Sequence, residues 1–472
     1  MSEEKENFRI RPPTCTRREA MKLLAASLLL PLLHAYVPNS LPPSPSEEEN
    51  KTKTTEPPLS PEIAPKYSRL ESLGYPPEDK VLVAAEGKNS AFYYCRQGIH
   101  AIPPEITEGN VRMVAARIHQ KVEHALEVAY DQVDYPRMAN YYQTDRRVCF
   151  YFTNFPDNPP GDCRSDNYCN RDRITEESSD LFRIVTSPYS HYSILNGPAI
   201  LKDSFMGEET ALHEVVHAVR NAYNGAQDPF VEQWCNAHTF LSGVGRKGKE
   251  WADKMLTEKN LFHLHEGFGF IAHLVSSYGS SESPLFSFWD LAGRVDKEIL
   301  NIFKRAYQKD PNGGLDLINQ ARLNKKAYAH AIASLRPEID DFDLFEEASK
   351  WLVSLHPDAV KKPIFSDLFD ASLAVESIKT PDFTKIEREL PEYDTEFDYY
   401  EFQQSRQEDS LVFKPLEGEY SIAVLRNGTP KIVNPGEPIL LNSGKTIMVV
   451  LRNPISSSNK WSHKGKYVLS KS

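Results

Sequence analysis

The sequence predicts an α+β fold: a long helix and a small sheet lead into a central helix, then come a helical region and a small β module. Apolar residues at helical spacing between residues 111 and 129 predict the first, amphipathic helix. Residues 147–153 and 181–186 are β-branched and aromatic runs bounded by Asp, Asn, Pro and Gly, so both predict strands. The 472 residues are enough for about two to four domains with sizeable cores.

Residues 1–37 have the features of a signal peptide or an N-terminal anchor. The apolar run at 23–37 is broken by Pro31 and is too short to span a bilayer comfortably. Arg17 and Arg18 precede this run, after a threonine, and resemble the twin-arginine export signal of bacteria. We therefore expect export to the periplasm or the extracellular space, with membrane attachment only if the segment is not cleaved. A buried helix of the folded domain is the alternative.

The segment 38–66 is predicted to be a disordered, proline-rich linker. It holds eight prolines among Ser, Thr, Glu and Lys and has almost no large apolar side chain, so burial cannot offset its ordering entropy. The main domain is expected to span 67–385. Within it we expect a short edge strand at 198–202 and a helix-rich stretch from about 250 to 380.

The last part of the chain is predicted to form an acidic connector and a β module. Residues 386–410 are acidic and tyrosine-rich, which is typical of a solvated connector. Within 411–472, the pair Asn427-Gly428 is a hairpin signal between two strand-like runs, and residues 446–451 form another such run. This pattern favours a small accessory module of the β-sandwich or β-barrel type.

Charge and cysteine content exclude some classes of function. The net charge of -11, with no clustered stripe of Lys and Arg, argues against binding to nucleic acid. Six cysteines are too few for a disulfide scaffold in a chain of this length, and they form no CxxC pairs of the structural-zinc type. Cys163 and Cys169 are close enough in sequence for a disulfide in an oxidising compartment, and two reduced thiols are the alternative.

The stretch His213-Glu214-Val215-Val216-His217 predicts a metal site on the central helix. Histidines four residues apart differ by only about 40° in direction on a helix, so their imidazoles can bind the same ion. Glu214 follows the first histidine directly and can accept the proton of an attacking water and pass it to the leaving amine. Two exposed histidines on an ordinary helix are the alternative.

The motif and its surroundings resemble the zincin metallopeptidases, in the branch whose third zinc ligand is a glutamate from the following helix. The resemblance covers about residues 107–242 and implies a zincin-like catalytic domain. It implies Glu232 as the third ligand, because this residue lies in the first turn of the next expected helix. It also implies that Asn236 orients His213 through its side-chain oxygen.

Several residues are alternatives or partners in this assignment. Asp228 has the spacing of the aspartate-ligand zincins, but an Asp directly before Pro229 is also a strong helix N-cap. Glu266, farther along the chain, is a second alternative ligand. Stabilisation of a transition state requires a Tyr, His or Arg at the open face, and sequence alone does not choose among those available. The candidates by residue type are Tyr189, His191, Tyr192, Tyr223, His238, His263 and His265.

Together, the motif and the resemblance predict an enzyme, a zinc-dependent peptidase with one Zn²⁺ per chain and a protein or peptide substrate. One alternative is a zinc-binding interaction protein without catalysis. Another is a secreted effector protease of narrow specificity, which shares the chemistry and differs in its substrate. Glu214 separates the enzyme from the binding protein, because a purely structural site has no use for an acid beside its water. The sequence leaves the oligomeric state open.

Overall fold

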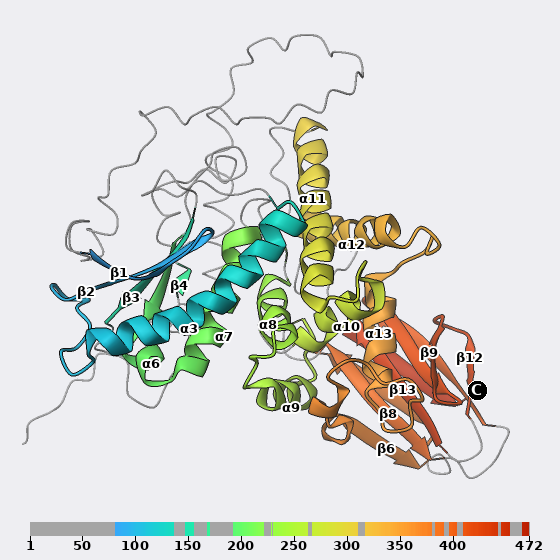
Figure 1. Ribbon diagram of the computed structural model, residues 1–472. Coiled ribbons are helices and arrows are strands. Elements are labelled where there is room, and N and C mark those ends of the chain that lie inside the picture. The colour runs from blue at the N-terminus through green and yellow to red at the C-terminus, as the bar shows by residue number, and fades with distance from the viewer. Residues whose placement is uncertain are drawn as a thin grey trace, which may run out of the picture.

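The computed structural model gives an α+β protein, in which an N-terminal sheet, a group of helices and a C-terminal β unit follow one another along the molecule (Figure 1). The signal segment, the linker, Cys163 and the strand predicted at 181–186 lie outside the described residues. None of the helices in the described segments is both long enough and apolar enough to cross a membrane. The structure describes residues 81–135, 147–154, 168–169, 192–220, 228, 230–262, 267–309, 317–379, 383–390, 396–403, 409–441, 445–453 and 465–471.

The N-terminal sheet has five strands in the order β1-β2-β3-β5-β4. Its three central strands are parallel to one another, and β1 and β4 pair antiparallel at the two edges. Strand β3 confirms the prediction for residues 147–153. The strands are β1 (Val81–Glu86), β2 (Ser90–Cys95), β3 (Val148–Thr153), β4 (Tyr168–Cys169) and β5 (Tyr192–Asn196).

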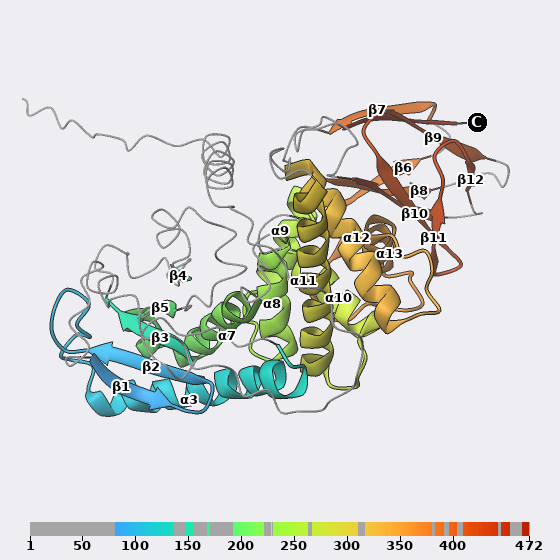
Figure 2. The same ribbon diagram turned by 90° about the horizontal axis from the view of Figure 1, so that it is seen from above.

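Helix α3 (Glu108–Glu127) confirms the predicted amphipathic helix and packs beside helix α7 (Ser204–Arg220), as Figures 1 and 2 show. Thr107 caps α3, because its hydroxyl accepts the Asn110 N–H at 3.2 Å. The two helices approach closely at Gly207, where a Cβ atom would lie 2.6 Å from Cδ1 of Ile118. The packing of α3 therefore fixes the helix that carries the histidines.

The middle of the chain is helical, which confirms the helix-rich stretch expected after residue 250. The edge strand predicted at 198–202 is wrong, because this segment forms helix α6. The Asn196 side chain accepts the Ala199 N–H at 3.4 Å and Pro198 occupies the first turn, and both features favour the start of a helix. The helices are α6 (Gly197–Lys202), α7, α8 (Val231–Leu241), α9 (Gly248–Glu258), α10 (Phe268–Tyr278), α11 (Pro284–Lys309), α12 (Leu317–Leu335) and α13 (Leu344–Ser354).

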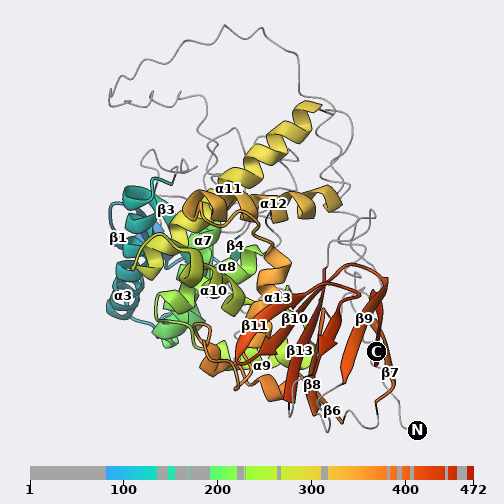
Figure 3. The same cartoon turned by 90° about the vertical axis from the view of Figure 1, so that its right-hand side faces the viewer.

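The C-terminal unit has two sheets, with strand orders β11-β10-β13-β8-β6 and β12-β9-β14-β7. Side chains from both sheets share one apolar core, so of the two forms expected for this unit, a β-sandwich or a β-barrel, it has the first. Figure 3 shows the two sheets. Asn427 and Gly428 have φ values of 52° and 72° and form the hairpin between β10 and β11, as predicted. The strands are β6 (Val375–Lys379), β7 (Lys385–Leu390), β8 (Phe397–Gln403), β9 (Ser410–Glu417), β10 (Tyr420–Arg426), β11 (Thr429–Val433), β12 (Pro438–Leu440), β13 (Lys445–Arg452) and β14 (Gly465–Lys471).

The solvated connector predicted at 386–410 is wrong, because β7 and β8 occupy much of this segment and belong to the sandwich. Its acidic groups have partners inside the protein. Asp398 accepts the Tyr467 hydroxyl at 2.5 Å, and Glu396 accepts two backbone N–H groups from the segment before α10. The β unit therefore begins at Val375, inside the range expected for the main domain, and not at residue 411.

The five-stranded sheet of this unit is covered on both faces. Along β8, Tyr399 packs into the large core that the helices share, whereas Tyr400 packs into the core between the two sheets. In β10, Ala423 and Val424 divide between the two cores in the same way. Helix α13 lies against the first face, beside β10 and β13. The sandwich is thus continuous with the helical part of the protein.

Candidate metal centre

Helices α7 and α8 pack against each other and bring the predicted metal ligands together. Along α7, Leu212, Val215 and Val216 are buried, so the valine-rich segment is held as a helix by burial of one face. His213 and His217 lie on another face of the same helix and are partly exposed. Glu232, in the first turn of α8, lies opposite them.

The three predicted ligands have spacings that suit one tetrahedral ion. The Nε2 atoms of His213 and His217 lie 3.2 Å apart. The Glu232 carboxylate spans them, with Oε2 at 3.2 Å from the first imidazole and Oε1 at 3.5 Å from the second. Two ligand atoms bound to zinc at about 2.0–2.1 Å in tetrahedral geometry lie about 3.3 Å apart. The donor set therefore fits a zinc ion without rearrangement of the helices.

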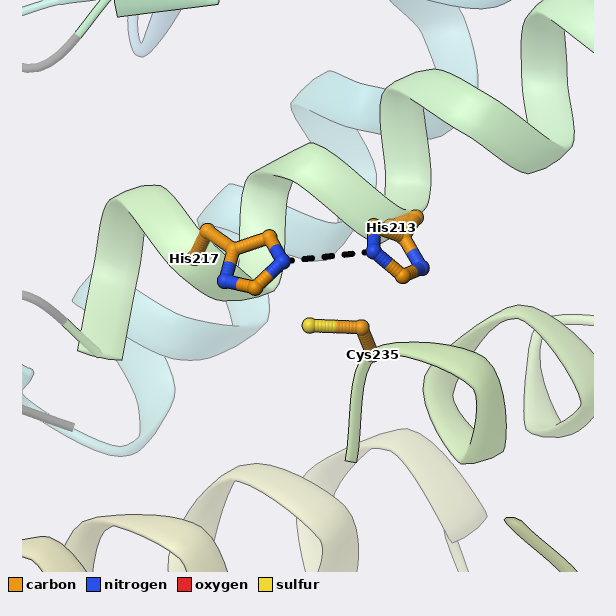
Figure 4. A group of neighbouring side chains, drawn as sticks. All are labelled: His213, His217 and Cys235. Carbon is orange, nitrogen blue, oxygen red and sulfur yellow. Dashed lines mark hydrogen bonds between the residues drawn. The ribbon is translucent and has the colours of Figure 1, made fainter. Parts of the chain in front are cut away.

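Cys235 is a further donor at this site, which the sequence interpretation missed (Figure 4). One nitrogen of each histidine and the Cys235 sulfur all lie within 4.8 Å of one another. The side chain is buried and is not in a disulfide. The sequence spacing could have predicted this donor. Cys235 follows Glu232 by three residues, and side chains three residues apart share a helix face.

Asn236 holds His213 in the orientation that the resemblance implied. The His213 ring donates its Nδ1–H to Oδ1 of Asn236 at 3.0 Å, which leaves Nε2 to face His217 and Glu232. An imidazole ligand is commonly fixed in this way by a hydrogen bond to its other ring nitrogen. The geometry therefore gives Asn236 an orienting position.

The charges of the site favour a cation between its donors. Burial by itself lowers the pKa of His213, but the hydrogen bond and charge of Glu232, with the charge of Glu214, outweigh burial and raise it to about 9. Burial likewise tends to raise the pKa of Glu232, and the two histidines hold it well below its usual range. Without a metal, a proton on His213 supplies the positive charge that the carboxylate requires. A metal ion that binds here must displace that proton.

Glu214 lies beside the two histidines on α7 and is only 3% exposed. Its charge contributes to the raised pKa of His213, so the carboxylate is electrostatically coupled to the donor set.

Asp228 has a structural position away from these donors. Its Oδ2 accepts a hydrogen bond from Arg220 Nη2 at 2.7 Å and another from the Tyr328 hydroxyl at 3.1 Å. Its Oδ1 accepts the Phe230 N–H at 3.0 Å, close to the start of α8. Because both oxygens have partners in the interior, the geometry favours Glu232 over Asp228 as the ligand. The other alternative, Glu266, lies outside the described residues.

The candidates for transition-state stabilisation are mostly beyond what the structure describes. His238 is completely buried between Phe288 and Trp289, and burial lowers its pKa to about 3, so it is a neutral core residue away from the exposed side of the site. Tyr192 is in β5, and its side chain is not among those described. Tyr189, His191, Tyr223, His263 and His265 lie outside the described residues.

No protein-family model matches this chain, and no curated protein matches it. What the site can do is therefore inferred from its own side chains. Two imidazoles, a carboxylate and a thiol make a donor set of the kind that zinc prefers.

Proposed function

We propose that this chain is a zinc-dependent peptidase of the zincin type, with His213, His217 and Glu232 as zinc ligands. The observation that carries the proposal is the spacing of these donors, which lie 3.2 to 3.5 Å from one another as the ligands of one tetrahedral ion do. The helix and strand order of residues 81–241, with two parallel strand pairs before the histidine helix, is compatible with this class.

Each residue of the site has its own role in peptide hydrolysis. A bound zinc ion supplies a Lewis acid that lowers the pKa of water and polarises a peptide carbonyl. Glu214 accepts the proton of the attacking water and returns it to the leaving amine. Asn236 keeps His213 in the tautomer whose Nε2 can bind the metal. The side chains of His213, His217 and Glu232 are 16%, 14% and 27% exposed, so solvent reaches the donors.

Replacing Glu214 tests this proposal. Glu214→Gln keeps the size of the side chain and removes its basicity, so we expect unchanged zinc content and thermal stability with a rate lower by about 10² to 10⁴. The assay is cleavage of casein, or of a whole proteome if the specificity is narrow. Glu250→Gln, an exposed change in the first turn of α9, is the matched control and should cleave as the wild type does. Equal cleavage by the Glu214 variant would contradict the proposal.

A zinc-binding protein without catalysis is the second candidate, and Cys235 is the observation that favours it. Structural zinc sites usually have four protein ligands and no position for water, and Cys235 offers a fourth donor. The wild-type protein decides between the two functions. Fully zinc-loaded protein that cleaves neither casein nor any component of a proteome would support the binding protein.

A further inference from the structure

The donors at this site come in two pairs, one from each helix. His213 and His217 are four residues apart on α7, and Glu232 and Cys235 are three residues apart on α8. Both spacings place the members of a pair on one face of their helix. Metal sites between packed helices are built from side chains on the facing helices. Cys235 and Glu232 both lie near the same two histidines across this interface.

The thiol approaches the site from the protein interior. Cys235 is 0% exposed, whereas Glu232 is partly exposed, so the thiol is the more deeply buried of the two α8 donors. The sulfur lies within 4.8 Å of one nitrogen of each imidazole. Sulfur and nitrogen bound to one zinc ion lie about 3.6 Å apart, given bonds of about 2.3 and 2.05 Å. The sulfur is therefore at most about 1.2 Å farther from these histidine nitrogens than coordination to one ion would require.

We propose that Cys235 is a fourth zinc ligand, so that the resting site holds its metal with two imidazoles, a carboxylate and a thiolate. This inference rests on the zinc site of the proposed function. Binding forms a zinc–sulfur bond and releases the thiol proton to solvent, and no electron is transferred. Four protein ligands fill a tetrahedral site, so water gains access only when one of them is displaced. Because Glu232 is on the exposed side, it is the ligand that an approaching substrate reaches first.

Cobalt(II) added to the metal-free full-length chain tests this ligand set. We expect visible d–d bands of a tetrahedral ion together with a near-ultraviolet sulfur-to-cobalt charge-transfer band. Cys235→Ser should lose the charge-transfer band and keep the d–d bands. Cys149→Ser changes another buried cysteine, in β3, and should keep both. Zinc affinity of Cys235→Ser should fall at least about tenfold, since loss of a residue that only orients a ligand already costs 10–100-fold.

The outcomes separate this inference from the proposed function. Wild-type protein that shows d–d bands without the charge-transfer band would overturn Cys235 as a ligand and leave the metal site intact. A charge-transfer band that persists in Cys235→Ser would also overturn it. A chain that binds no cobalt and no zinc would overturn both claims. X-ray absorption of the zinc-loaded wild type gives the same answer without a variant, because a zinc–sulfur distance of about 2.3 Å differs from zinc–nitrogen distances of about 2.0–2.1 Å.

Discussion

Helix α7 carries two polar clusters one turn apart, and they are built in different ways. At His213 and His217, the donors face one carboxylate and are partly exposed. At Arg220, a guanidinium binds Asp228 and Asp296, and all three side chains are 0% exposed. In the Arg220 cluster the chain supplies the cation itself. In the histidine cluster it supplies side chains that can bind a cation.

The two clusters therefore differ in their access to solvent. The Arg220 guanidinium has its charge balanced by two buried carboxylates, and Trp234 packs against it with the Arg220 Cζ atom 5.1 Å from the ring centroid. The histidine cluster is partly exposed, so solvent reaches it. The buried cluster lies next to it and ties α7 to α11 through Asp296, so it holds the histidine helix in place.

Replacing Arg220, the cation that the chain itself supplies, should cause the largest loss of stability. Arg220→Met leaves Asp228 and Asp296 buried without their counter-charge, so we expect a loss of about 3–5 kcal/mol in the free energy of unfolding. Urea unfolding measured with a chelator present excludes any contribution from bound metal. The control is Arg246→Met, which breaks an exposed ion pair with Asp203 and should cost only a small fraction of that loss. Similar losses for both variants would contradict the distinction between the clusters.

Adding zinc should have the next largest effect on the stability of the folded protein. Zinc at roughly a hundred times its Kd should stabilise the protein by about 2.7 kcal/mol, because it binds the folded chain and not the unfolded one. His217→Ala should abolish this gain. His330→Ala, an exposed histidine of α12 paired with Glu298, should keep it. The measurement is thermal unfolding with and without zinc, and an equal zinc effect in wild type and His217→Ala would remove the metal site from these residues.

A smaller effect is expected from the residue that orients the first histidine. Asn236→Ala removes the acceptor of the His213 Nδ1–H, so zinc affinity should fall about 10–100-fold. Asn236→Asp keeps an oxygen acceptor and should retain most of the affinity. Competition against a chromophoric chelator measures both variants. Unchanged affinity in the alanine variant would show that the hydrogen bond does not position the ring.

The sequence predicted the helices that carry the site better than the sheets around them. Periodicity showed α3, because its apolar residues lie on one stripe. Strands β2 and β8 were missed, and neither shows the alternation that reveals a half-buried strand. Strand β3 lacks alternation too and was predicted from its β-branched and aromatic residues alone. In β8 the acidic residues also suggested solvent exposure, and only the fold shows that Asp398 bonds with Tyr467.

The candidate site was predictable to the extent that its residues share a helix. His213 and His217 follow from spacing alone, and the position of Glu232 opposite them agrees with the resemblance to zincins. Cys235 was not predicted, because a catalytic zinc site needs only three protein ligands and one open position for water. The burial of Arg220 depends on Asp296, far away in the chain, and no local pattern connects the two.

The five-stranded sheet of the C-terminal unit is buried on both faces, and this affects how the protein can evolve and unfold. Its side chains alternate between the helical core and the sandwich core, so the same strands belong to both. Across the junction, the Glu396 carboxylate accepts hydrogen bonds from the backbone N–H groups of Leu261 and Phe262, at 2.8 and 2.6 Å. Loss of the β-sandwich by recombination would expose the helical core that its sheet covers. The helices and the sandwich should therefore melt in a single cooperative transition.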